Sequence, residues 1–138
     1  MKKSLTVLLT FVFALLFFQC KKESEHLNIT LYDKSSSVIE SYVSGKWKLQ
    51  YTRAGFSGYI YYSKYNDYLQ ISDKRIVMGN DSSGIVMDTV FSWNKTDLGN
   101  GTFTYLLNNF FVNRINNDTL ILSEYLLDGS TYHYTKFK

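Results

Sequence analysis

The fold is decided by residues 37–51, which read Ser37-Val-Ile-Glu-Ser-Tyr-Val-Ser-Gly-Lys-Trp-Lys-Leu-Gln-Tyr51. Ser37 and Glu40 have the spacing of a capping box, and apolar residues at helical spacing follow them. This pattern predicts a short helix that ends at Gly45, because glycine readily adopts the left-handed conformation of a helix end. From Lys46 to Tyr51 polar and apolar residues alternate, which is the period of a half-buried strand. We therefore expect a short helix that leads into the first strand of a β-sheet protein.

The remainder of the chain repeats the strand pattern. Alternating segments and turn signals recur about every 8–12 residues, a spacing typical of an all-β sandwich or barrel. The pairs Asn108-Asn109 and Asp128-Gly129 and the triplet 116–118 suit tight hairpins, and the segments 79–84 and 96–101 are predicted to be polar loops. No connection is long enough for a crossover helix, so we expect an antiparallel, up-and-down sheet of eight or nine strands that closes on itself. The expected strands are 46–53, 58–63, 66–72, 74–79, 84–94, 102–107, 110–116, 118–126 and 130–137.

The segment Gly45-Lys46-Trp47 matches the G-x-W motif that opens the first strand of lipocalin-like barrels. With the short helix before it and the strands after it, the stretch 36–138 resembles that family. The resemblance implies a small antiparallel up-and-down β-barrel of about eight strands. It also implies that Trp47 closes one end of the barrel and that a basic residue of the last strand packs over it. Lys136 is the best match for this residue and Arg114 is the second.

The N-terminus has the layout of a targeting segment. Basic residues at positions 2 and 3 precede a stretch from Leu5 to Phe18 that is apolar except for two threonines, and Cys20 follows directly. The stretch is short for a membrane span and typical of a signal peptide. It resembles the signal peptide of Gram-negative bacterial lipoproteins, in which the cysteine becomes the first mature residue and carries acyl chains such as palmitate. An ordinary secretory signal with an incidental cysteine, or an uncleaved anchor, are the alternatives.

The chain therefore divides into three parts: a signal peptide at 1–19, a flexible tether from the lipidated Cys20 at 20–35, and a lipocalin-like domain at 36–138. The resemblance implies a cell-envelope protein anchored by lipid to the outer membrane. Its domain faces either the periplasm or the cell surface. Mixed charge after Cys20 resembles the surface-export signal of some bacterial lineages.

Composition and charge exclude some classes of function. Two of the 15 basic residues, Lys2 and Lys3, lie in the leader, so 13 basic and 12 acidic residues remain, a net charge of +1. The basic residues are scattered rather than clustered, which argues against nucleic acid as a partner. His133 is the only histidine after residue 26 and Cys20 is the only cysteine, so we predict no metal site, no cofactor and no enzymatic activity.

Four residues are candidates for ligand binding: Tyr59, Tyr61, Arg114 and Glu124. Tyrosine offers an apolar ring with a polar tip, which suits a pocket, although it also suits a half-exposed strand. Glu124 faces inward if Leu120 and Leu122 do, and outward in the other register. A buried carboxylate needs a partner, and we predict Arg114 on the neighbouring strand. We expect the inward register, with Ile121 and Tyr125 outside.

Two functions follow from these interpretations. The first is a lipid-anchored envelope protein that binds a small apolar or amphipathic ligand inside the barrel. The second is a non-enzymatic interaction or structural module with a filled barrel and an envelope protein as its partner. A cavity of roughly 300 Å³ or more, lined by apolar groups and a few polar ones, favours the first.

Overall fold

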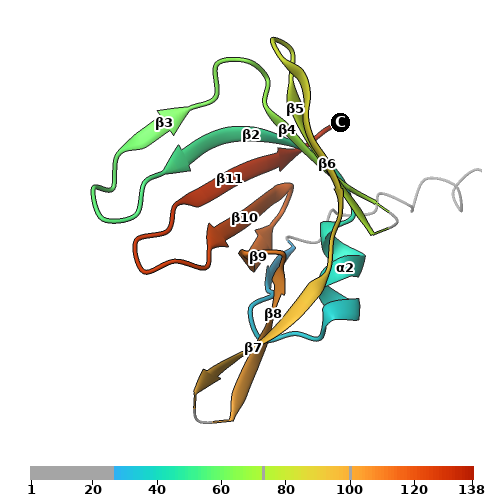
Figure 1. Ribbon diagram of the computed structural model, residues 1–138, viewed down its shortest axis with the longest axis vertical. Coiled ribbons are helices and arrows are strands. Elements are labelled where there is room, and N and C mark those ends of the chain that lie inside the picture. Colours follow the sequence, from blue (N-terminus) through green and yellow to red (C-terminus); the bar gives the residue numbers. More distant parts are fainter. Residues whose placement is uncertain (1–26, 73, 100) are drawn as a thin grey trace, which may run out of the picture.

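The computed structural model describes residues 27–72, 74–99 and 101–138, which form one large antiparallel sheet of 11 strands with one short helix (Figure 1). No helix in these ranges is long and apolar enough to cross a membrane. The expectation that every strand pairing is antiparallel is confirmed. The elements are β1 (Asn28–Thr30), α2 (Ser36–Val43), β2 (Gly45–Arg53), β3 (Ile60–Tyr62), β4 (Tyr68–Ser72), β5 (Arg75–Asn80), β6 (Gly84–Val90), β7 (Trp93–Gly99), β8 (Thr102–Leu107), β9 (Phe110–Asn116), β10 (Thr119–Glu124) and β11 (Thr131–Lys136).

The sheet is not closed into a barrel, so the predicted closure is wrong. The strand order is β6-β5-β4-β2-β11-β10-β9-β8-β7, with β1 paired to β9 and β3 paired to β2. Strands that follow one another in sequence are paired from β4 to β6 and from β7 to β11, and β11 pairs back with β2. The ring of pairings is therefore interrupted at one place, between β6 and β7.

The interruption lies where the chain passes directly from one end strand to the other. β6 and β7 are joined only by Phe91 and Ser92. The N–H of Phe91 bonds to the carbonyl of Lys74 beside β5, whereas the N–H of Ser92 bonds to the side chain of Asn108 beside β8. One continuous extended segment is thus hydrogen bonded first to one partner and then to another. Because β6 pairs with β5 and β7 pairs with β8, β6 and β7 do not pair with each other and the sheet stays open.

Two sequence predictions for residues 84–101 are wrong. The predicted strand 84–94 is divided, and residues 93–99, expected to begin a polar loop at 96, form β7 paired with β8. The Asp128-Gly129 turn is also longer than expected, because β10 ends at Glu124 and β11 begins at Thr131. The hairpins at Asn108 and Asn117 are confirmed, and both residues have the positive φ that such turns require.

The predicted capping box of Ser37 and Glu40 is wrong, because the N-cap lies two residues earlier than predicted. The N-cap is Ser35, it makes no side-chain cap hydrogen bond, and its hydroxyl lies 3.2 Å from that of Ser37. The N–H of Ser44 bonds to the carbonyl of Glu40 and ends the helix. Gly45 then has φ +132° and already belongs to β2.

Residues before the helix also belong to the fold. β1 lies within the stretch 20–35 that we assigned to a flexible tether, and it pairs with the end of β9. Leu31 is completely buried, and its N–H bonds to the carbonyl of Asn113. The predicted signal peptide and Cys20 lie outside the described residues.

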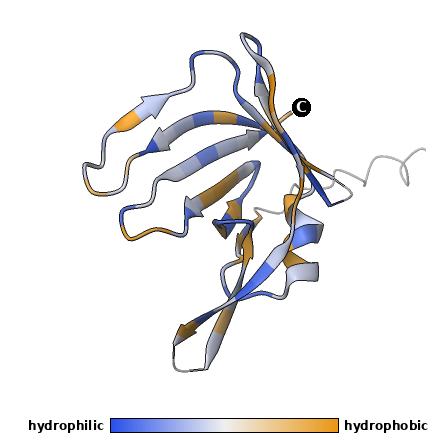
Figure 2. Cartoon of the chain, in the orientation of Figure 1, coloured by the Kyte–Doolittle hydropathy of each residue, from blue (hydrophilic) through white to orange (hydrophobic). Residues whose placement is uncertain are grey.

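The core lies inside the curl of the sheet, with α2 across one end, which we call the closed end. Trp47 is 1% exposed, and its indole N–H donates to the carbonyl of Val43 at 2.7 Å. Ile39 and Val43 of the helix are fully buried beside it, and hydrophobic residues continue along β10 (Figure 2). The amino group of Lys136 lies 5.5 Å from the Trp47 ring centre. The last strand therefore brings a cation over this tryptophan.

Among the register shifts in the sheet, those in β2 and β9 decide which side chains of these two strands face the core. The register between β2 and β11 shifts between His133 and Tyr134, so Gln50 is an extra residue in β2. Leu49 therefore packs on the core, while Tyr51 stacks on His133 on the opposite, outer face, with ring centres 4.2 Å apart. Tyr51 does not share the face of Trp47 as strict alternation predicts. A second bulge, at Asn113 in β9, has the same effect against β10.

Replacement of Trp47 tests the closed end. We expect Trp47→Ala to lower the free energy of unfolding by about 3–5 kcal/mol, since it empties the space of a large buried ring. Trp47→Phe keeps most of the ring but leaves the Val43 carbonyl without its donor, so we expect an intermediate loss of about 1–3 kcal/mol. Denaturant titration measures both. A loss below about 1 kcal/mol for Trp47→Ala contradicts a structural role for the G-x-W motif.

Candidate functional site

The inner face of the sheet encloses a cavity of about 350 Å³, which we call the inner hollow. Most of its wall is apolar or aromatic, and it contains few polar groups. Met78 and Met87 come from the paired strands β5 and β6, and Tyr134 comes from β11. The lining is Leu49, Asp67, Tyr68, Met78, Gly79, Asn80, Val86, Met87, Tyr132 and Tyr134.

The inner hollow lies away from the closed end. Its polar lining comes from the beginning of β4 and the end of β5, where Tyr68 pairs with Gly79. The opposite ends of these strands, near Ile71 and Ile76, are buried in the core with Trp47. A Cβ at Gly79 would lie 2.7 Å from the Tyr68 hydroxyl, so this position keeps the strand backbone and the ring in close contact. The hollow therefore opens at the end remote from α2.

Glu124 and Tyr132 form a polar contact beside this cavity. The Tyr132 hydroxyl donates to Glu124 Oε1 at 2.6 Å, and the N–H of Ser130 donates to Oε2 at 2.9 Å. Burial, followed by the hydrogen bond to Glu124, raises the pKa of Tyr132 to about 12. Burial also raises the pKa of Tyr134, whose side chain is 2% exposed. Both phenols are therefore protonated at neutral pH. The proton of Tyr132 is donated to Glu124, so the Tyr134 hydroxyl rather than that of Tyr132 can donate to a ligand.

The inward register predicted for β10 is correct for its leucines, but the predicted partner of Glu124 is wrong. Leu120 and Leu122 are buried, and Tyr125 is 50% exposed. Arg114 is exposed and stands opposite Ile121, which points to the other side of the sheet from Leu120. The bulge at Asn113 separates Arg114 from Glu124, and Tyr132 takes its place.

The candidate tyrosines of the second strand do not reach the inner hollow. Tyr59 is 68% exposed and Tyr61 is 62% exposed, and neither lines the cavity. Both belong to the segment around β3, which pairs with the C-terminal end of β2. The tyrosines that do line the cavity are Tyr68, Tyr132 and Tyr134. These three tyrosines lie at the same end of the sheet. The sequence could have singled them out only if the strand pairing had been known.

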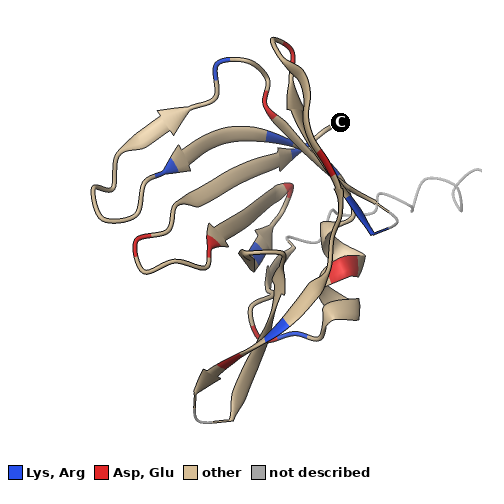
Figure 3. Ribbon diagram, viewed as in Figure 1, with Lys and Arg blue, Asp and Glu red and all other residues tan. Residues whose placement is uncertain are grey.

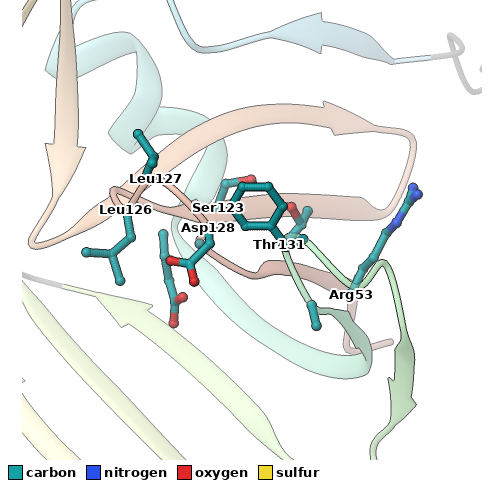
Figure 4. Close-up of a pocket in the computed structure, with 11 residues that line it drawn as sticks. Arg53, Ser123, Leu126, Leu127, Asp128 and Thr131 are labelled. Atoms are coloured by element: carbon teal, nitrogen blue, oxygen red, sulfur yellow. The ribbon is translucent and has the colours of Figure 1, made fainter.

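A second hollow, of about 500 Å³, lies between the β2–β3 and β10–β11 connections (Figure 4). A Cβ at Gly55 would lie 2.0 Å from the carbonyl oxygen of Asp128, so glycine is required where these connections meet. Apolar side chains on the rim are strongly exposed: Phe56 by 86% and Leu127 by 99%. Figure 4 shows Arg53 directed away from Asp128. This loop hollow is more polar and more open than the inner hollow.

Charged residues are scattered over the strands and loops (Figure 3). In the described ranges no group of three or more His, Cys, Asp or Glu is placed to hold a metal ion. His133 lies on the outer face against Tyr51, on the opposite side of the sheet from the Glu124–Tyr132 pair. The arrangement inside the curl is thus suited to holding an apolar molecule with one or two hydrogen bonds.

Removal of the Tyr132 hydroxyl tests the polar contact. We expect Tyr132→Phe to lower the free energy of unfolding by about 1–3 kcal/mol, because Glu124 loses a short hydrogen bond to a charged acceptor. Tyr125→Phe is the matched control, and its half-exposed ring predicts a change within about 0.5 kcal/mol. Denaturant titration of both variants measures the difference. Equal losses contradict the stabilising role of this hydrogen bond.

No family model, curated protein or solved structure matches this chain.

Proposed function

We propose that this protein binds a small apolar or amphipathic molecule in the inner hollow. The observation that carries the proposal is a mainly apolar cavity of about 350 Å³ inside the curl of the sheet. Small-molecule sites are typically concave and apolar with a few placed polar groups, and they start at about 300 Å³. Methionines on two paired strands suit an irregular ligand, since the thioether chain adapts its shape.

The polar groups of the hollow define how an amphipathic ligand lies. Its apolar part fits against Leu49, Met78 and Met87. Its polar end fits toward the phenols, which stay protonated at neutral pH. Asp67 adds an acceptor at the same end of the strands. Asn80 adds an amide N–H donor, because its carbonyl oxygen already accepts the backbone N–H groups of Ser82 and Ser83. A neutral polar group, such as a hydroxyl or an amide, is favoured over a carboxylate there because Asp67 and nearby Glu124 would repel an anion.

We also propose that the domain is lipocalin-like and anchored to the outer membrane through a lipid on Cys20. The G-x-W motif, the helix across one end and Lys136 over Trp47 support the family resemblance. The described chain starts at the closed end, where the N–H of Asn117 bonds to the carbonyl of Leu27. A tether from Cys20 would thus join the closed end and leave the mouth of the inner hollow directed away from the membrane.

An interaction module for an envelope protein is the second candidate. The exposed rim of the loop hollow favours it, because Phe56, Leu126 and Leu127 present apolar side chains on two adjacent connections. Clustered exposed apolar residues are typical of protein contact sites. In this function the inner hollow has no resident molecule.

A substitution at the mouth of the inner hollow distinguishes the two functions. Val86 lines the hollow and is 67% exposed, so Val86→Trp should obstruct the mouth without disturbing the core. We expect the fluorescent probe N-phenyl-1-naphthylamine to bind this variant at least about tenfold more weakly, a loss of about 1.4 kcal/mol. Val90→Trp is the matched control, since Val90 is 72% exposed on the same strand and lies outside the hollow.

Fluorescence titration of the purified protein measures these affinities, and native mass spectrometry of protein from its own envelope identifies a retained molecule. Equal probe affinity in both tryptophan variants would exclude the inner hollow as the binding site. No probe binding in the unaltered protein would favour the interaction module.

The anchoring proposal has its own test. We expect Cys20→Ser to move the protein from the membrane fraction to a soluble or unprocessed form, because several acyl chains hold a protein far more firmly than one. Fractionation and intact mass measurement report the change. Unchanged membrane partitioning of a correctly cleaved serine variant contradicts lipidation.

A further inference from the structure

The outer face of the sheet carries a row of side chains that the inner hollow does not use. Across four neighbouring strands, the register places Thr30 opposite Arg114, Arg114 opposite Ile121, and Ile121 opposite His133. His133 in turn stands opposite Tyr51, and the two rings are stacked. The row therefore contains a guanidinium and an imidazole with an apolar side chain between them.

This row forms part of a cavity of about 470 Å³, which we call the outer hollow. β1 and the residues that follow it provide one wall, where the ring of Tyr32 packs against Phe111 with centres 5.4 Å apart. The other side is β11. The lining is Thr30, Tyr32, Asn113, Arg114, Ile121, Thr131 and His133. Among the residues that the structure describes, no acidic one lines it.

The polar groups of the outer hollow are mainly donors. Arg114 has only donors, and Thr30, Tyr32 and Thr131 each carry a hydroxyl that can donate. The side-chain amide of Asn113 donates a hydrogen bond to the Ser123 hydroxyl at 2.7 Å, which fixes the Asn113 side chain in the outward direction. An anion with several acceptor oxygens matches this set, and a cation does not.

The positive charge of Arg114 at the hollow has no ion-pair partner within the described chain. The ion pairs in these ranges are Lys34 with Asp33 and Arg75 with Asp88, so Arg114 is in neither. Glu124, the acid predicted to neutralise it, is bonded to Tyr132 on the inner side. Partial burial, then the charges of Arg114 and Arg53, lower the pKa of His133. The charged groups that perturb His133 from the neighbouring strands are thus both cationic.

We propose that the outer hollow binds an oxyanion group, carboxylate or phosphate, on a small molecule whose flat apolar part lies over Ile121. Arg114 binds the anion from one side and His133 from the other. The volume suits a small molecule rather than a folded partner. The site is on the opposite face from the inner hollow and does not depend on the function proposed there.

Anion binding in the outer hollow and protonation of His133 are thermodynamically coupled. An anion that binds beside His133 favours its protonated form, so the bound anion must raise the pKa of that imidazole. By reciprocity, the protonated protein binds the anion more tightly. A ligand in the inner hollow has no such effect on His133.

The test uses inorganic phosphate, phenyl phosphate, acetate and benzoate as probes at constant ionic strength, with chloride as the salt control. NMR follows the ring proton of His133, assigned with His133→Gln, and calorimetry measures affinity. We expect a saturable shift and a raised His133 pKa. Phenyl phosphate and benzoate should bind more tightly than phosphate and acetate, because only they have a flat apolar part.

Two variants distinguish binding at a specific site from nonspecific attraction of anions to positive charge. We expect Arg114→Gln to weaken binding at least about tenfold. Lys95→Gln removes the same charge from β7, at the far end of the strand order, and should bind as the unaltered protein does. Tighter binding of the phosphates or of the carboxylates identifies which oxyanion the site prefers. Equal affinity of the two variants, or no saturable shift with any probe, would overturn the proposal.

Discussion

The hydrogen bond from the Trp47 indole to the Val43 carbonyl fixes the closed end, and the rest of the fold depends on it. It joins the last residue of α2 to the third residue of β2, across the single intervening turn at Ser44. The helix is held over the end of the curl, so Ile39 and Val43 are covered and the apolar ends of the neighbouring strands are kept from water. A buried indole N–H needs an acceptor, and this carbonyl is one that the end of the helix leaves free. Lys136 completes the arrangement from the last strand.

The sequence predicted the antiparallel strands, most of their positions and the inward leucines of β10 because these depend on local alternation and on turn residues. It did not predict the two bulges, because a single extra residue such as Gln50 or Asn113 leaves no local signal yet reverses the faces beyond it. The partner of Glu124 was wrong for that reason. The prediction of closure was wrong for another reason. Residues 84–94 read as one continuous strand, and only tertiary contacts show that this segment is divided between a partner in β5 and a partner in β8.

The alternation of side chains along β11 separates two kinds of chemistry. Tyr132 and Tyr134 flank His133 in β11, and the phenols face the curl while the imidazole faces outward. On the inner side this gives an apolar cavity with hydroxyl donors and nearby carboxylates. On the outer side it gives cationic groups, hydroxyls and no lining acid. One strand thus contributes to two hollows of opposite electrostatic character. The short branches β1 and β3 pair with β9 and β2 only where β8 and β4 no longer do.

The pairing of the first long strand with the last has a consequence for how the chain acquires its shape. Most pairings in the sheet are hairpins between neighbours, which form quickly because the loops to be closed are short. The β2–β11 ladder instead joins segments that are far apart in the sequence, and a side-chain hydrogen bond links Gln50 and Thr135 across it, 85 positions apart. It cannot form until β11 has been synthesised. Until then Trp47 lies on an edge strand with its apolar face only partly covered, so the nascent sheet remains an incomplete meander that is exposed to aggregation.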